Sequence, residues 1–214
     1  MSAVLDPGPS GQIPADQQAG IVLQASTFGV FFGQLVVATL GVLVISGEYS
    51  TGMIRSTLTA VPGRLGALWA KAAVLFVATF LVGAVSTIAA YFVASPFLAA
   101  QGVSASLLGD GLLMPLLGGA LYLALVAVLA LGVGTMLRSS AGGIAAVLGI
   151  LLILPLVLSM IPTEWAAAAM PYLFSSAGNG LFALQPDISY LAISLAWVAA
   201  SLGGASLLLV RRDA

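Results

Sequence analysis

Apolar and polar positions alternate along this chain in long blocks. Five apolar stretches, uncharged apart from Lys71 at the start of the second, are separated by shorter polar segments. Crossing the hydrocarbon core of a membrane takes about 20 apolar residues in a helix, and each stretch is long enough. We therefore predict an all-α polytopic membrane protein whose single transmembrane domain covers residues 1–214. The predicted spans are residues 25–46, 70–94, 112–137, 141–161 and 188–210.

Charge predicts how these spans are oriented. All basic residues lie in the predicted loop 47–69, at the start of the second span beside it, in the turn at residues 138–140 or in the C-terminal tail, which alternating spans place on one side: Arg55, Arg64, Lys71, Arg138, Arg211 and Arg212. Basic loops mark the cytoplasmic side. We therefore expect segments 1–24 and 162–187 to be external, the N-terminus to be outside and the C-terminus to be cytoplasmic.

The N-terminal segment leaves two interpretations open. Residues 1–20 are rich in Pro, Gly, Gln and Asp and have neither a basic start nor an apolar signal segment. Either five spans are native, or this segment is an external loop that follows an upstream helix missing from the chain.

Composition agrees with a membrane protein and excludes much chemistry. The chain is 61% hydrophobic and 6% charged, and its mean hydropathy is +1.17, whereas soluble domains are about 25% charged. It has no Cys and no His, so disulfides, zinc centres and His-based catalytic triads are excluded, and we expect neither a catalytic nor a metal site. A net charge of −1 without any basic run argues against nucleic acid as a partner.

The energy source is also constrained by charge. No Asp, Glu, Lys or Arg lies near the middle of a predicted span, although proton- and ion-coupled carriers keep such residues despite their cost. The only lysine, Lys71, follows Ala70, so the chain has no Gly-x-x-x-x-Gly-Lys-Ser/Thr phosphate loop. If ATP drives this protein, ATP and magnesium are bound by another polypeptide.

The segment after the first span predicts a short cytoplasmic helix. Ser50 or Thr51 can cap it, and Pro62 with Gly63 ends it. Its apolar residues recur at helical spacing: Met53, Ile54, Leu58 and Val61. This amphipathic helix could simply lie at the membrane surface as part of a loop.

The same segment resembles a family, the permeases of bacterial type-2 ATP-binding-cassette (ABC) exporters. The resemblance rests on Gly47-Glu48-Tyr49-x-x-Gly52-x-Ile54-Arg55, followed by Leu58, Pro62, Arg64 and Ala70-Lys71. It implies that this loop holds a coupling helix seated in a groove of a separate ATPase. The implied coupling residues are Glu48, Tyr49, Gly52, Ile54, Arg55, Leu58, Arg64 and Lys71.

The resemblance has further implications. We expect a P-loop ATPase subunit and a second permease copy or paralogue as partners, no cofactor on this chain, and a place in the bacterial plasma membrane. The family has six spans, and its first has no counterpart here. The alternative is a non-transporting assembly or regulatory subunit, or a truncated remnant of a permease.

Other residues suggest packing or a path for substrate. Several glycines allow close helix contacts, either within the bundle or in a dimer: Gly29, Gly33, Gly118, Gly119, Gly132 and Gly134. Pro155 predicts a kink in the fourth span. The polar residues inside or beside the spans face either a substrate path or a neighbouring helix: Gln24, Gln34, Thr39 and Tyr122.

The external loop 162–187 is expected to hold a short helix over residues 164–170 and a polar turn over residues 175–180. Trp165 and Tyr172 suit the membrane interface. A Pro-Tyr-Leu-x-Ser-x-Ala pattern at residues 171–177 adds to the family resemblance, which implies short re-entrant helices here.

Overall fold

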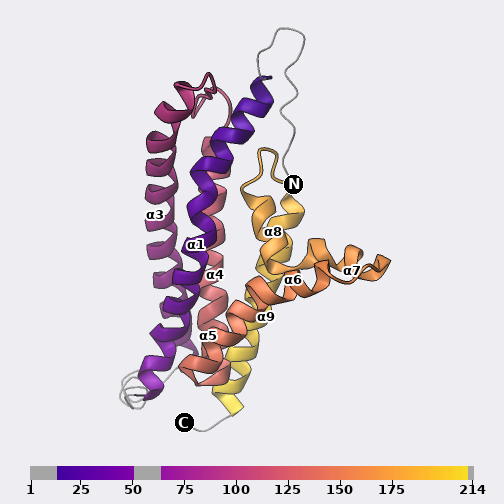
Figure 1. Ribbon diagram of the computed structural model, residues 1–214. Coiled ribbons are helices and arrows are strands. Elements are labelled where there is room, and N and C mark those ends of the chain that lie inside the picture. The colour runs from indigo at the N-terminus through magenta and orange to yellow at the C-terminus, as the bar shows by residue number, and fades with distance from the viewer. Residues whose placement is uncertain (1–13, 51–63, 212–214) are drawn as a thin grey trace.

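The computed structural model describes residues 14–50 and 64–211, and every element within them is a helix (Figure 1). Five candidate spans, each long and apolar enough to cross a membrane, lie in the five predicted regions. The prediction of an all-α polytopic fold is therefore confirmed. The spans are formed by α1 (Ala15–Ser50), α3 (Arg64–Ala99), α4 (Leu113–Leu137), the pair α5 (Ser140–Leu148) and α6 (Leu154–Ser159), and α9 (Ile188–Arg211).

Helix α4 forms the centre of the bundle. It is apolar on all sides, as expected for a helix that is surrounded by others, and it packs against α1, α3 and α9. From Ala120 to Gly134 almost every residue is buried. Leu116, Leu129 and Leu131 are completely buried, with exposed fractions of 0 to 1%. The other spans present much of their surface outward, where lipid rather than water is the expected surrounding.

Helices α1 and α3 are longer than their apolar windows predicted. Each has 36 residues, which is about 54 Å of helix. Hydropathy marks only the part of a helix that matches the hydrocarbon core, whereas polar residues such as Gln17 and Gln18 continue the helix beyond it. The predicted external segment 1–24 is thus helical from Ala15. Beyond the predicted span 70–94, α3 continues past Pro96 to Ala99.

A second hydrophobic cluster stabilises these protruding ends. It joins Val22 of α1, Tyr91 of α3 and the loop residues Val103 and Leu112. The hydroxyl of Tyr91 donates to the carbonyl of Ala105 at 2.8 Å. The loop that connects α3 to α4 is therefore packed against both helices rather than extended into solvent.

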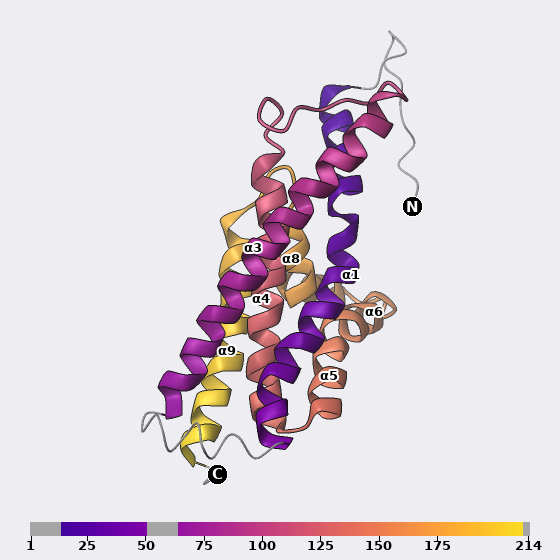
Figure 2. The same ribbon diagram turned by 90° about the vertical axis from the view of Figure 1, so that its left-hand side faces the viewer.

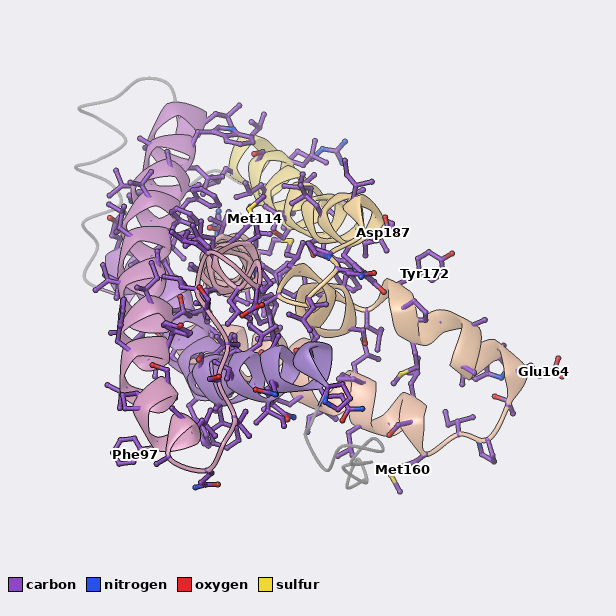
Figure 3. The ribbon with its side chains drawn as sticks, turned by 90° about the horizontal axis from the view of Figure 1, so that it is seen from above. Phe97, Met114, Met160, Glu164, Tyr172 and Asp187 are labelled. Carbon is purple, nitrogen blue, oxygen red and sulfur yellow. The ribbon has the colours of Figure 1, made fainter. Side chains whose placement is uncertain are left out.

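The fourth span is interrupted where Pro155 predicted a kink. A π-helical segment, Gly149–Ile153, separates α5 from α6, and the N–H of Leu154 donates to the carbonyl of Gly149. Proline has no backbone N–H to donate to the hydrogen-bond ladder of an α-helix. The wider π-helical turn just ahead of Pro155 accommodates this missing hydrogen bond. Beyond this point α6 and α7 (Glu164–Ala169) leave the bundle sideways, and Glu164 lies at the tip of this arm (Figures 1 and 3).

The chain returns to the bundle through α8 (Phe174–Leu181), which packs on α4 and α9. The expected short helix 164–170 matches α7 and the 3₁₀ turn Met170–Tyr172. The predicted polar turn at residues 175–180 is wrong, because these residues are helical. Glycine disfavours helices in isolation, but here tertiary packing of Phe174, Gly178 and Leu181 overrides that preference.

Charge separates the two ends of the bundle. Lys71, Arg138 and Arg211 belong to one end, which we call the basic end: the C-terminus of α1, the start of α3, the α4–α5 turn and the end of α9. Asp110 and Asp187 lie at the opposite end, which we call the acidic end, where α3 connects to α4 and α8 connects to α9. Figure 2 shows the long helices running between these two ends.

Candidate functional site

An ion pair at the basic end joins α1 to α3. The ammonium group of Lys71 is hydrogen-bonded to Oε2 of Glu48, and the two side chains are 21% and 22% exposed. Glu48 lies in the last turn of α1, and Lys71 lies in the second turn of α3. The pair therefore connects the end of α1 to the start of α3, the two helices that segment 51–63 links along the chain.

The same end of α1 is also attached to α5. The hydroxyl of Ser140 is 2.8 Å from the hydroxyl of Ser46. One turn earlier, Val42 lies so close to Gly143 that a Cβ on this glycine would be 2.6 Å from the valine side chain. A displacement of the end of α1 must therefore also move α5 or break these contacts.

The turn between α4 and α5 is a tight connection. Arg138 has a φ of 53°, a left-handed conformation that is uncommon for residues with a side chain. Its N–H donates to the carbonyl of Gly134 at 3.0 Å, and Ser139 caps α5 by accepting from the N–H of Gly142 at 3.2 Å. The chain thereby reverses its direction within the two residues between α4 and α5, which brings Ser140 to the end of α1.

Among the coupling residues implied by the resemblance, the structure brings Glu48 and Lys71 together. Tyr49 is within α1 and Arg64 is the first residue of α3. The remaining four lie outside the described residues: Gly52, Ile54, Arg55 and Leu58. The contacts of Ser46 and Ser140 were not predicted, because a serine near a helix end is usually only a cap.

A second polar contact lies inside the bundle. The hydroxyl of Tyr122 on α4 donates to Oε1 of Gln34 on α1 at 2.6 Å, and both residues are buried. The Tyr122 ring lies between Phe174 and Phe182, at ring-centroid distances of 5.8 and 6.0 Å. Two of the polar residues singled out in the sequence therefore bond to each other, and α8 covers the tyrosine.

Of the other polar candidates, Thr39 bonds within its own helix, to the carbonyl of Leu35 at 2.8 Å. Gln24 is exposed on the surface of α1. Neither residue lines the hollow between α1 and α3 or the cavity between α3, α4 and α9. The structure therefore separates Gln24 and Thr39 from the buried pair.

The glycines singled out in the sequence divide into two groups. A Cβ on Gly118 would be 2.0 Å from the carbonyl oxygen of Leu181, and one on Gly132 would be 2.7 Å from the hydroxyl of Ser201. Such residues are needed for packing within the chain. In contrast, a Cβ on Gly29 would meet nothing within 4 Å, and one on Gly33 would only be in ordinary contact with Leu123.

Gly29 and Gly33 line a hollow of about 510 Å³ between α1 and α3. Hydroxyl residues also contribute to its walls, but Ser26 bonds to a carbonyl of its own helix, and Thr87 bonds to carbonyls of its own helix and of Leu116 on α4. No charged residue lines it. This hollow is therefore an uncharged indentation in the membrane-facing surface.

No group of three or more His, Cys, Asp or Glu side chains within residues 14–50 and 64–211 is placed to hold a metal. No protein-family model, curated protein or solved structure matches the chain, so these comparisons assign it to no family. What the fold itself defines is the class: the protein is a multi-pass helical membrane protein. The features that bear on a more specific function are the contacts at the basic end and the positions of the charged side chains.

Proposed function

We propose that this chain is the membrane-spanning permease subunit of an ABC exporter in the bacterial plasma membrane, driven by a separate P-loop ATPase. The observation that carries the proposal is the Glu48–Lys71 ion pair. It joins the two helices that flank segment 51–63, which is the segment where the sequence resembles the coupling loop of type-2 exporters.

The geometry suits transmission of a mechanical displacement. ATP-driven closure of a partner can move a permease only if the contacted segment is firmly attached to membrane helices. The ends of α1 and α3 are joined by the ion pair, and α1 is attached to α5 through Ser46, Ser140, Val42 and Gly143. A force applied to segment 51–63 would therefore be transmitted to α1, α3 and α5 together.

Charge supports ATP rather than an ion gradient as the energy source. The charged side chains that the structure describes are at the ends of the bundle or on the α7 arm: Glu48, Lys71, Asp110, Arg138, Glu164, Asp187 and Arg211. A proton- or ion-coupled carrier needs ionisable groups along its path. Since the chain also lacks a phosphate-binding loop, the proposal places ATP and magnesium on the partner.

A second permease subunit, identical or similar, belongs to this proposal. Small residues allow membrane helices to approach closely, and the space beside Gly29 on α1 is open. Little of the fourth span is buried within the chain, and Leu156 and Met160 of the α6 arm are 58% and 74% exposed. These surfaces are available for a second copy that would complete a central pathway.

The test is purification of the tagged chain in a mild detergent with its ATPase, followed by ATP hydrolysis and transport in lipid. Charge reversal at Glu48→Lys should reduce transport per ATP hydrolysed, and combining it with Lys71→Glu should restore coupling, because the ion pair is re-formed with opposite polarity. Ile54→Asp and Arg55→Glu should weaken binding of the ATPase without preventing membrane insertion.

Asp110→Asn, at the acidic end, is the matched control and should change none of these readouts. Failure to co-purify any P-loop ATPase would leave the alternative of a non-transporting assembly or regulatory subunit. Normal ATPase recruitment and transport by Glu48→Lys, Ile54→Asp and Arg55→Glu would contradict the coupling role directly.

A further inference from the structure

A groove opens at the acidic end of the bundle. Helices α3 and α9 lie close together near the basic end and diverge toward the acidic end, with α4 between them (Figure 2). The resulting cavity has a volume of about 370 Å³, which is within the range of small-molecule sites. We call it the outer groove, and its apolar walls come from Phe80, Met114, Leu117, Leu121, Ile188 and Leu191.

One charged side chain, Asp187, lines this groove. It directly precedes α9, and its Oδ1 accepts a hydrogen bond from the N–H of Ser189 at 3.0 Å. Its second carboxylate oxygen has no partner within residues 14–50 and 64–211, and the residue is exposed. Figure 3 looks down on this end of the bundle and labels Asp187 and Met114.

The outer groove is therefore apolar in its interior and charged at its mouth. Phe80 and Leu121 form its apolar interior, and the carboxylate lies where the loop between α8 and α9 meets the first turn of α9. A ligand that fits this arrangement has an apolar body and a charged or polar end that points out of the bundle. Burying the apolar body would supply most of the binding energy.

The sign of that end follows from the surroundings. Asp110 and Asp187 are the charged side chains that the structure describes in the connections at the acidic end, whereas Lys71, Arg138 and Arg211 are all at the other end. The potential at the mouth of the groove is therefore negative, which concentrates cations there. An anion or the phosphate of a zwitterionic lipid would be repelled by the same carboxylate.

We infer that the outer groove binds a lipophilic monovalent cation, whose apolar body contacts Leu117, Leu121 and Leu191 and whose positive charge lies beside Asp187. A neutral lipophile would use the walls but not the carboxylate, which distinguishes it from the proposed ligand. The inference concerns binding alone and needs neither ATP nor a partner subunit, so it stands or falls separately from the proposed transport.

Two ions of nearly the same size and shape and of opposite charge test it: tetraphenylphosphonium and tetraphenylborate. Binding of each is measured on the full chain in nanodiscs made of zwitterionic lipid. The wild-type chain should bind the cation, and Asp187→Asn should weaken this binding by about fivefold, which is the effect of one exposed charge pair. Asparagine also caps helices, so α9 keeps its start.

Two further variants separate the groove from general membrane charge. Asp110→Asn removes the other acid of this end, which accepts from the N–H of Ser106 at 2.6 Å and does not line the groove, and it should leave binding unchanged. Met114→Trp replaces a side chain that is 71% exposed and lies in the groove. It should block the cation by filling the cavity without disturbing the core.

Four results would overturn the inference. The first is no saturable binding of tetraphenylphosphonium, and the second is binding of tetraphenylborate with equal affinity. The third is an Asp187→Asn chain that binds the cation as the wild type does. The fourth is a tightly retained phospholipid that tetraphenylphosphonium cannot displace and that is lost on Asp187→Asn, because the groove would then be a lipid site.

Discussion

The hydroxyl of Tyr122 on α4 donates to the side-chain oxygen of Gln34 on α1 at 2.6 Å, inside the most buried part of the bundle. Because no water is available in a hydrocarbon core, each of these groups depends on the other for its hydrogen bond. The bond joins the central helix to α1, the helix that it contacts most extensively, and the aromatic rings of Phe174 and Phe182 pack against the tyrosine.

Removing this hydroxyl should therefore destabilise the fold measurably. Tyr122→Phe leaves Oε1 of Gln34 without its donor, and we expect the free energy of unfolding in mixed micelles to fall by about 1 kcal/mol. The double variant Tyr122→Phe with Gln34→Leu should recover part of that loss, because no polar group is then left unpaired. Tyr172→Phe is the control, since Tyr172 is 66% exposed; an equal loss there would contradict the argument.

The contact between α8 and α4 should be sensitive to a single methyl group. A Cβ on Gly178 would lie 2.1 Å from the Tyr122 ring, so Gly178→Ala must displace either α8 or the ring. We expect a loss of about 1–3 kcal/mol in unfolding free energy, as for other overpacked sites.

Gly203 on α9 provides the matched control, because a Cβ there would meet nothing within 4 Å. Gly203→Ala should be neutral or slightly stabilising, since alanine favours helices by about 1 kcal/mol over glycine. If both variants behaved alike in thermal unfolding, the packing of α8 against Tyr122 would not be the cause.

Two glycines of the same helix should respond in opposite ways. A Cβ on Gly41 would be 2.4 Å from the carbonyl oxygen of Ala127, whereas one on Gly29 would meet nothing within 4 Å. Gly41→Ala should therefore separate α1 from α4 and lower the melting temperature, while Gly29→Ala should not lower it. Thermal unfolding followed by circular dichroism of the two purified variants measures this, and a larger loss for Gly29→Ala would refute it.

Sidedness can be tested with single cysteines, because the chain contains none. Leu108 is 76% exposed in the loop at the acidic end, and Ser139 is exposed in the turn at the basic end. A membrane-impermeant maleimide should label Leu108→Cys in intact cells and Ser139→Cys only after permeabilisation. The reverse pattern would show that the basic end faces outward and would remove segment 51–63 from the reach of a cytoplasmic ATPase.

The number, approximate position and class of the spans could be predicted from the chain because they depend on local properties. An uncharged stretch of sufficient length is a candidate span whatever its neighbours are. The interruption of the fourth span was also predictable, since Pro155 lies well inside that span and has no N–H to donate to the regular hydrogen-bond ladder. Helix ends were less accurate, as α1 and α3 show, because helices continue beyond the apolar window.

The candidate site could be predicted only in part from the sequence. Glu48 and Lys71 could be selected as members of one loop, but their pairing depends on how α1 and α3 lie against each other. The contact between Ser46 and Ser140 brings together residues that are 94 positions apart. The prediction for residues 175–180 failed for the same reason, because a distant ring, that of Tyr122, stabilises the helix there.

By itself the sequence determined a multi-pass helical protein, the charge difference between its two ends, and the absence of Asp, Glu, Lys and Arg from the middle of its spans, because these follow from residue types along one chain. Only the tertiary structure decided which helix is central, which polar groups satisfy each other, and where a carboxylate meets an apolar groove. Such relationships depend on the approach of distant helices, and side-chain packing between them determines that approach.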